Sequence, residues 1–245
     1  MVESRSEQII TNIATVKQRI SNACIKSNRN PDEVKLLLVT KTIPVEQIKT
    51  ALLAGETLIG ENKVQELKEK YEALKDIPHT SHFIGHLQSN KIKEILKYDV
   101  SCIQSLDRPE LAEKLHQRLR FENKTMEVLI QVNSSYEESK FGASPDTVID
   151  LVKQVAQLET LKIKGLMTIG LLSPEPGQVR KGFRLLKDIQ QQIIALNIPH
   201  VEMKELSMGM SGDLEIAIEE GATMVRVGTA IFGQRPAPNT SYLTR

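Results

Sequence analysis

The chain has 245 residues, of which 40% are apolar and 26% charged, and its formal net charge is +1. This composition is typical of a soluble globular protein, and the near-zero charge gives no reason to expect nucleic acid or an anionic membrane as a partner. No apolar run approaches the length of a membrane span, the N-terminal segment has no apolar signal core, and Cys24 and Cys102 show neither disulfide-framework nor metal spacing, so we expect a cytoplasmic protein.

The first predicted element is an amphipathic helix over about residues 4–26, in which Ile9, Ile13 and Val16 recur at helical spacing. Eight short apolar segments follow, typical of buried parallel strands, at residues 36–40, 57–60, 82–85, 100–104, 126–132, 163–169, 205–208 and 223–227. Segments with helical character separate them, at residues 44–54, 62–75, from about 90, 108–120, 145–158, 178–195 and 212–220. Asp107 is expected to cap the helix that follows it.

Eight strands that alternate with helices favour an α/β fold, a single-domain (β/α)8 TIM barrel with an extra N-terminal helix. The expected domain spans residues 1–245, with the barrel core at about 30–235. The competing fold is a doubly wound open sheet, which the strand count and the lack of a GxGxxG after the first strand disfavour.

Lys41 stands at the carboxyl end of the first predicted strand, where barrels and open α/β sheets bind their ligands. A partly buried amine there can lose its proton and attack a carbonyl to form a Schiff base. Most lysines at strand ends simply reach solvent, so this position needs support from the rest of the chain.

Two loops of small residues, 207–213 and 227–230, follow the seventh and eighth predicted strands, where barrels often bind phosphate. Their glycines let backbone N–H groups approach an anion, and a helix starting near Gly212 would point its positive end there. Either loop alone would be an ordinary glycine turn, but adjacent strand ends favour phosphate binding. An amine for an aldehyde together with a phosphate site is what pyridoxal 5'-phosphate (PLP) requires.

Several segments also resemble one protein family, over about residues 5 to 235. They are VTKTIPVEQI (39–48), IGENKVQEL (59–67), HFIGHLQSNK (82–91), SKFG (139–142), GLMTIG (165–170) and LSMGMSGDLEIAIEEGATMVRVGTAIFG (206–233). They resemble the PLP homeostasis proteins, also called YggS-like or PROSC-like. The resemblance implies a barrel similar to the N-terminal half of alanine racemase. It also implies that the protein holds PLP as a lysine aldimine and, like the family, has no well-established catalytic turnover.

The resemblance also implies a set of site residues. Lys41 matches the Schiff-base lysine, Asn62 a residue near the cofactor ring, and Arg226 the arginine that faces the pyridine nitrogen. The phosphate-side loops are matched by Ser207, Met208, Gly209 and Ser211 in the first and by Gly228 and Thr229 in the second. Two departures lie outside this set, at Ser81 and His86, where many family members have an aromatic residue and a proline.

Arg226 bears most directly on the expected function. A guanidinium can only donate, so it would leave the ring nitrogen unprotonated and the ring a poor electron sink. Alanine racemase adds a tyrosine base from a second domain, and we expect no counterpart of that domain in this chain. We therefore expect a PLP-binding protein, not a strong enzyme, that takes part in intracellular PLP homeostasis or delivery. Apo PLP enzymes or free amino acids are the expected recipients, and we expect a monomer.

Two alternatives remain open at this point. One is a PLP-dependent amino-acid racemase-like enzyme, and the other is a barrel that binds a different phosphorylated metabolite with Lys41 as an aldolase-like amine. Lys63 and Lys91 are the other candidate amines, whereas His86 and Met167 are candidate residues of the barrel mouth. No metal is expected, because the histidines lack a Cys or a paired carboxylate to complete a site.

Overall fold

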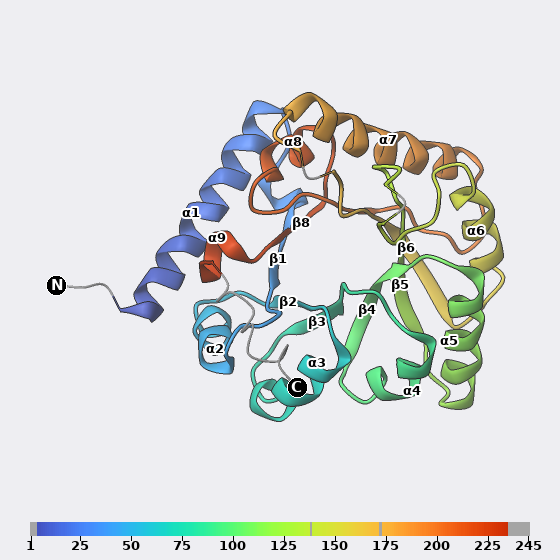
Figure 1. Ribbon diagram of the computed structural model, residues 1–245, viewed down its shortest axis with the longest axis horizontal. Helices are drawn as coiled ribbons and strands as arrows, with labels where there is room; N and C mark the ends of the chain where they lie inside the picture. Colours follow the sequence, from blue (N-terminus) through green and yellow to red (C-terminus); the bar gives the residue numbers. More distant parts are fainter. Residues whose placement is uncertain (1–3, 138, 172, 235–245) are drawn as a thin grey trace, which may run out of the picture.

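The computed structural model describes residues 4–137, 139–171 and 173–234. Its strands form one closed barrel in chain order, every neighbouring pair parallel, with β8 closing against β1 (Figure 1). The strands are β1 (Lys35–Val39), β2 (Leu58–Glu61), β3 (Thr80–Phe83), β4 (Val100–Leu106), β5 (Met126–Gln131), β6 (Leu161–Met167), β7 (Glu205–Ser207) and β8 (Met224–Val227). The predicted (β/α)8 barrel is therefore confirmed, and the open sheet is excluded because β1 pairs with β8.

Helices surround the barrel on its outer side (Figure 1). They are α1 (Arg5–Lys26), α2 (Val45–Leu53), α3 (Val64–Leu74), α4 (Ile92–Ile95), α5 (Pro109–Phe121), α6 (Val148–Val155), α7 (Pro176–Ala195), α8 (Leu214–Glu219) and α9 (Thr229–Phe232). Two short 3-10 turns, η1 (Pro31–Glu33) and η2 (Ser89–Lys91), complete the described elements.

Side chains that alternate along the strands separate two apolar layers. Leu38 of β1 packs into the large core between strands and helices. Leu37, Val39 and Met224 form a small cluster of their own inside the barrel. Because successive side chains of a strand point to opposite faces, Arg226, two residues after Met224, lies on the inner side.

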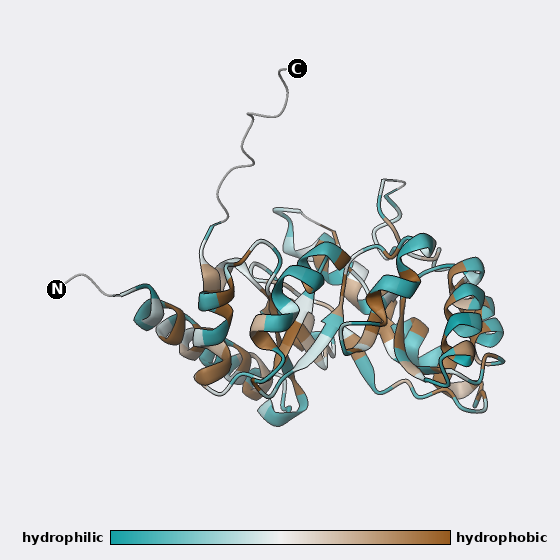
Figure 2. Ribbon diagram, turned by 90° about the horizontal axis from the view of Figure 1, so that it is seen from below, coloured by the Kyte–Doolittle hydropathy of each residue, from teal (hydrophilic) through white to brown (hydrophobic). Residues whose placement is uncertain are grey.

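The N-terminal helix α1 is confirmed and packs on the outside of the barrel, mainly against α2, α8 and α9 (Figure 1). A capping box of Ser4 and Glu7 begins it, and Ile9 and Val16 are among the apolar side chains that it buries. Burying each such side chain contributes about 1.5–3 kcal/mol. Figure 2 shows the resulting alternation of hydrophilic and hydrophobic stretches along the helices. Arg19 adds an ion pair to Glu215 of α8 at 2.6 Å.

Several predicted boundaries were wrong. The strand predicted at 82–85 occupies Thr80–Phe83, and the helix predicted from 212 begins at Leu214, so its end is not at Gly212. Asp107 does not cap α5, because its carboxylate accepts a hydrogen bond from Arg108 at 2.5 Å instead.

Parts of the expected domain, residues 1–3 and 235–245, lie outside the described residues, so its bounds stay a prediction. Within the described residues, no helix is both long and apolar enough to cross a membrane.

Candidate functional site

Lys41 lies in a turn just beyond the carboxyl end of β1, and its side chain is half-buried. The next residue, Thr42, has a φ of 63°, a left-handed conformation that non-glycine residues rarely adopt. Such a residue costs about 1–3 kcal/mol and persists only where its surroundings hold it.

A buried ion-pair cluster behind the turn supplies that support. The ammonium of Lys70, on α3, donates to the carbonyl of Thr40 at 2.8 Å, to Oε1 of Glu61 at 2.7 Å and to Oε2 of Glu66 at 3.0 Å. The hydroxyl of Thr40 also donates to Glu61 at 2.6 Å, and the backbone N–H of Thr42 donates to Glu66 at 2.5 Å. The backbone on both sides of Lys41 is thus fixed by one cluster.

The two carboxylates of this cluster have opposite pKa shifts. Burial raises the pKa of Glu61, and the nearby charge of Lys70 offsets only part of that effect. Burial also acts to raise the pKa of Glu66, but hydrogen bonds from Thr42 and Lys70 outweigh it, so the pKa is lowered. Lys70 is buried although it stands in a stretch of α3 that is rich in charged residues.

Arg226 is buried inside the barrel, where its guanidinium donates to the hydroxyl of Ser207 at 2.9 Å and to the carbonyl of Thr168 at 2.7 Å. Its third nitrogen, Nε, makes no hydrogen bond with the residues that the structure describes. Burial lowers the Arg226 pKa to about 10, with the charge of Asp213 acting in the opposite direction. The group therefore stays charged at neutral pH and can only donate.

The two predicted phosphate loops lie side by side, because the hydroxyl of Ser211 accepts the backbone N–H of Ala230 at 3.2 Å. In the described part of the chain, the backbone N–H groups of Ser211, Gly228 and Thr229 have no hydrogen-bond partner. These three donors suit an anion.

Two features of the first loop differ from the prediction. The carboxylate of Asp213 accepts the N–H of Met210 at 2.6 Å, which removes that donor from a phosphate site. Position 209 requires glycine for two reasons. Its φ is 91°, and an added Cβ would lie only 2.5 Å from the Cβ of Ala217. Its role is thus conformational, whatever else it binds.

The remaining predicted residues divide between the site and the core. Asn62 follows β2 and is half-buried, in line with a place at this end of the barrel. His86 is half-buried and stacks on Phe141 with ring centroids 3.8 Å apart. Met167 and Met208 are fully buried: Met167 packs inside the barrel, and Met208 belongs to the outer core, so its side chain faces away from the barrel interior.

The alternative amines are less favourable. Lys63 is exposed at the start of α3, and Lys91 is exposed and paired with Glu94 at 3.0 Å. Neither has the clamped backbone of Lys41. No group of three or more metal-ligand side chains occurs among the described residues.

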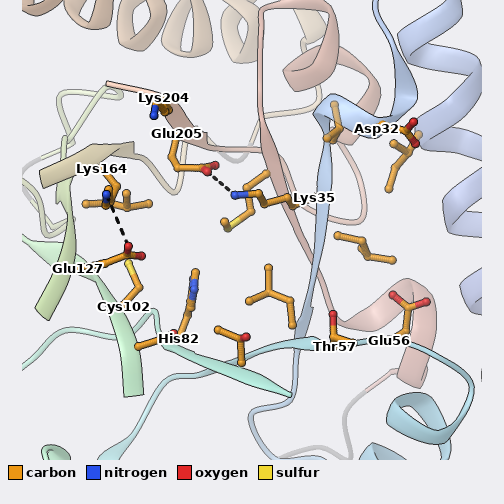
Figure 3. Close-up of a pocket in the computed structure, with 18 of the residues that line it drawn as sticks. Asp32, Lys35, Glu56, Thr57, His82, Cys102, Glu127, Lys164, Lys204 and Glu205 are labelled. Atoms are coloured by element: carbon orange, nitrogen blue, oxygen red, sulfur yellow. Dashed lines mark hydrogen bonds and ion pairs between the residues drawn. The ribbon is translucent and has the colours of Figure 1, made fainter. Parts of the chain in front are cut away.

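A cavity of about 920 Å³ lies at the opposite, amino-terminal end of the strands (Figure 3). Charged side chains around it pair with one another, such as Lys35 with Glu205 and Lys164 with Glu202, the latter at 2.8 Å. The paired charges leave no clear preference for an anion or a cation, so the cavity does not compete with the site at the carboxyl ends.

A family model described as "Alanine racemase, N-terminal domain" matches residues 6–236. A curated relative from Aquifex aeolicus, named pyridoxal phosphate homeostasis protein, is 42% identical over 223 residues, which cover 91% of this chain and 96% of the relative. The chain belongs to this family of pyridoxal phosphate homeostasis proteins. The resemblance identified from the sequence motifs is thereby confirmed.

Solved structures agree with this membership. The structure of PipY from Synechococcus elongatus without PLP is 33% identical, with a TM-score of 0.79, and the match covers 89% of this chain and 99% of PipY. A second PipY structure is described as having PLP bound. An alanine racemase from Clostridium difficile has a TM-score of 0.74 but only 15% identity, and the match covers 58% of it, so it shows the shared fold alone.

Proposed function

We propose that this protein binds PLP at the carboxyl ends of its strands, attaches it through Lys41, and serves PLP homeostasis in the cytoplasm without strong catalysis of its own. Bound PLP supplies an aldehyde for reversible attachment to an amine. The observation that carries the proposal is the set of N–H groups at Ser211, Gly228 and Thr229 that have no partner among the described residues. They lie on two adjoining loops, and the second loop follows β8, which pairs with the strand that leads to Lys41.

The residues present fit the parts of this cofactor. The three N–H groups suit the phosphate, the half-buried Lys41 supplies the amine, and the unused Nε of Arg226 provides a donor for a ring acceptor. Asn62, Ser207 and Gly209 complete the proposed site at the ends of β2 and β7. Met208 belongs to it only as part of the loop backbone, because its side chain lies in the outer core and its N–H donates to the carbonyl of Met224.

Arg226 favours holding over turnover. Even with a pKa lowered to about 10, the guanidinium keeps its proton at neutral pH. It would therefore leave the ring nitrogen unprotonated, whereas carbanion chemistry needs that nitrogen protonated. The relatives' name, pyridoxal phosphate homeostasis protein, supports the same assignment. We further propose apo PLP enzymes or free amino acids as recipients and a monomer as the working form.

The test is the visible absorbance of the purified protein with added PLP, followed by borohydride reduction and peptide mapping. We expect a visible band and a trapped peptide that contains Lys41, both lost in Lys41→Ala and kept in the matched control Lys63→Ala. Trapping on Lys63 or Lys91 would overturn the assignment of Lys41, and the absence of any band would overturn the cofactor.

The competing function is a racemase-like enzyme, because the chain shares its fold with alanine racemase. It predicts multiple-turnover racemisation of alanine that disappears in Lys41→Ala. The proposed carrier predicts exchange of bound PLP with added amino acids and no such turnover.

A further inference from the structure

Gln104 of β4 is a fully buried polar residue inside the barrel, and both polar atoms of its side chain have partners. Its Oε1 accepts the hydroxyl of Ser207 at 2.6 Å. Its Nε2 lies 2.7 Å from Nδ1 of His82 and donates to the sulfur of Met224 at 3.1 Å. An apolar side chain could fill this space without the free-energy cost of burying an amide. The amide therefore points to a role for its hydrogen bonds.

These contacts form a chain in which the donors all point in one direction. Arg226 has no acceptor, so it must donate to Ser207, whose own proton then goes to Oε1 of Gln104. That leaves Nε2 of Gln104 to donate to His82, so Nδ1 of His82 accepts and its ring proton sits on Nε2. Every donor therefore points away from Arg226.

The chain crosses the inside of the barrel between opposite strands. Arg226 and Ser207 lie on β8 and β7, and Gln104 and His82 on β4 and β3. His82 lines the cavity at the amino-terminal end, where its ring points into the space between the strands (Figure 3). Burial lowers the His82 pKa to about 4, so the ring is neutral at physiological pH, as an accepting Nδ1 requires.

We propose that Gln104 and His82 are positioning residues that orient the guanidinium of Arg226 through Ser207. With Ser207 and Thr168 fixing two of its nitrogens, the guanidinium plane is held and Nε keeps a constant direction. The effect on bound PLP rests on the proposed function, whereas the direction of the hydrogen-bond chain does not.

Two substitutions separate positioning from space filling. Gln104→Met keeps the volume but removes the acceptor of Ser207, while Gln104→Glu keeps that acceptor and obliges His82 to donate from Nδ1. Positioning therefore predicts that the glutamate variant binds PLP like the wild type, and that the methionine variant binds it about tenfold more weakly with a shifted visible band, the size expected for one lost buried hydrogen bond. If Gln104 only fills space, the methionine variant should bind PLP like the wild type and the glutamate variant should bind it more weakly, because only the glutamate variant buries a new charge.

Cys102→Ala is the matched control, because Cys102 lies two residues away on the same inner face and takes no part in the chain. It should leave the band and the PLP affinity unchanged. In an Arg226→Lys background, Gln104→Met should add nothing further, since the two changes act on the same contact.

A measurement without PLP keeps the inference testable if a variant fails to fold. The ¹⁵N spectrum of the imidazoles in the PLP-free wild type, with His82 assigned by its loss in His82→Gln, should show the proton on Nε2. A proton on Nδ1 would overturn the chain. If the tautomer is as expected but PLP does not bind, the proposed function fails while the chain stands; if PLP binds and Gln104→Met matches the wild type, the positioning role fails.

Discussion

Lys70→Met is expected to destabilise the protein strongly, because it leaves a buried carboxylate without its cation. The Lys70 side chain is 10% exposed and that of Glu61 is 2% exposed, and their charged atoms lie 2.7 Å apart. Removing one partner of such a pair costs about 3–5 kcal/mol, a large share of the roughly 5–15 kcal/mol that stabilises a domain.

The penalty should depend on pH in a definite direction. The pKa of Glu61 is raised in the folded state, so its charge lowers stability as pH rises through that value. Loss of Lys70 removes a cause that lowers this pKa, so the pKa rises further and the deficit grows from acidic to neutral pH. Glu66 acts in the same sense, because its lowered pKa stabilises the fold above the usual carboxyl range and the loss of Lys70 weakens that effect.

Urea unfolding followed by circular dichroism at about pH 5 and pH 8 measures both effects. Lys68→Met is the control, since Lys68 is exposed on the same helix and its loss changes the net charge equally; it should shift the free energy of unfolding by no more than about 0.5 kcal/mol. Adding Glu61→Gln to Lys70→Met should recover much of the loss, because the amide oxygen can still accept from Thr40. Equal deficits at both pH values, or no recovery in the double variant, would refute this reasoning.

Two further outcomes follow from burial and backbone geometry. Gly209→Ala should lower the free energy of unfolding by about 2 kcal/mol or more, since φ is 91° and the new methyl meets Ala217, whereas Gly177→Ala, with nothing within 4 Å, should change it by no more than about 0.5 kcal/mol; thermal melts of both variants compare them. Cys24 and Cys102 are buried and burial raises the pKa of each thiol, so neither should react with a thiol reagent at about pH 8 until the protein is unfolded, and rapid labelling of the native protein would contradict this.

The strand order and the strand ends were predictable because they depend on local patterns. Apolar runs and the turns between them predicted eight strands, and the carboxyl end of β1 then placed Lys41 correctly. The boundary errors arose where apolar residues continue past the last strand pairing. Ile84 and Gly85 were assigned to a strand, but Gly85 lies directly against the backbone of Asn62, where a loop packs on a loop.

The supporting polar residues were not predicted, although the sequence contained a signal for each. Lys70 lies three residues after Leu67 and four before Leu74, both buried, so helical spacing placed it on the apolar face of α3. Gln104 lies two residues after Cys102 in a strand, which puts both on the inner face. Their partners come from other elements far along the chain, and no periodicity reveals such pairings.

Two separate polar networks thus support the two basic side chains of the proposed site, Lys41 and Arg226. The Lys70 cluster, between β2 and α3, fixes the turn that carries Lys41, and the Gln104 chain, inside the barrel, fixes Arg226. Both networks are built from buried groups that pair with one another, so each holds its group in a defined direction. If Lys41 and Arg226 contact PLP as proposed, a site with its amine and its ring donor fixed in this way would favour tight, reversible holding, and an arginine at the ring would limit carbanion chemistry.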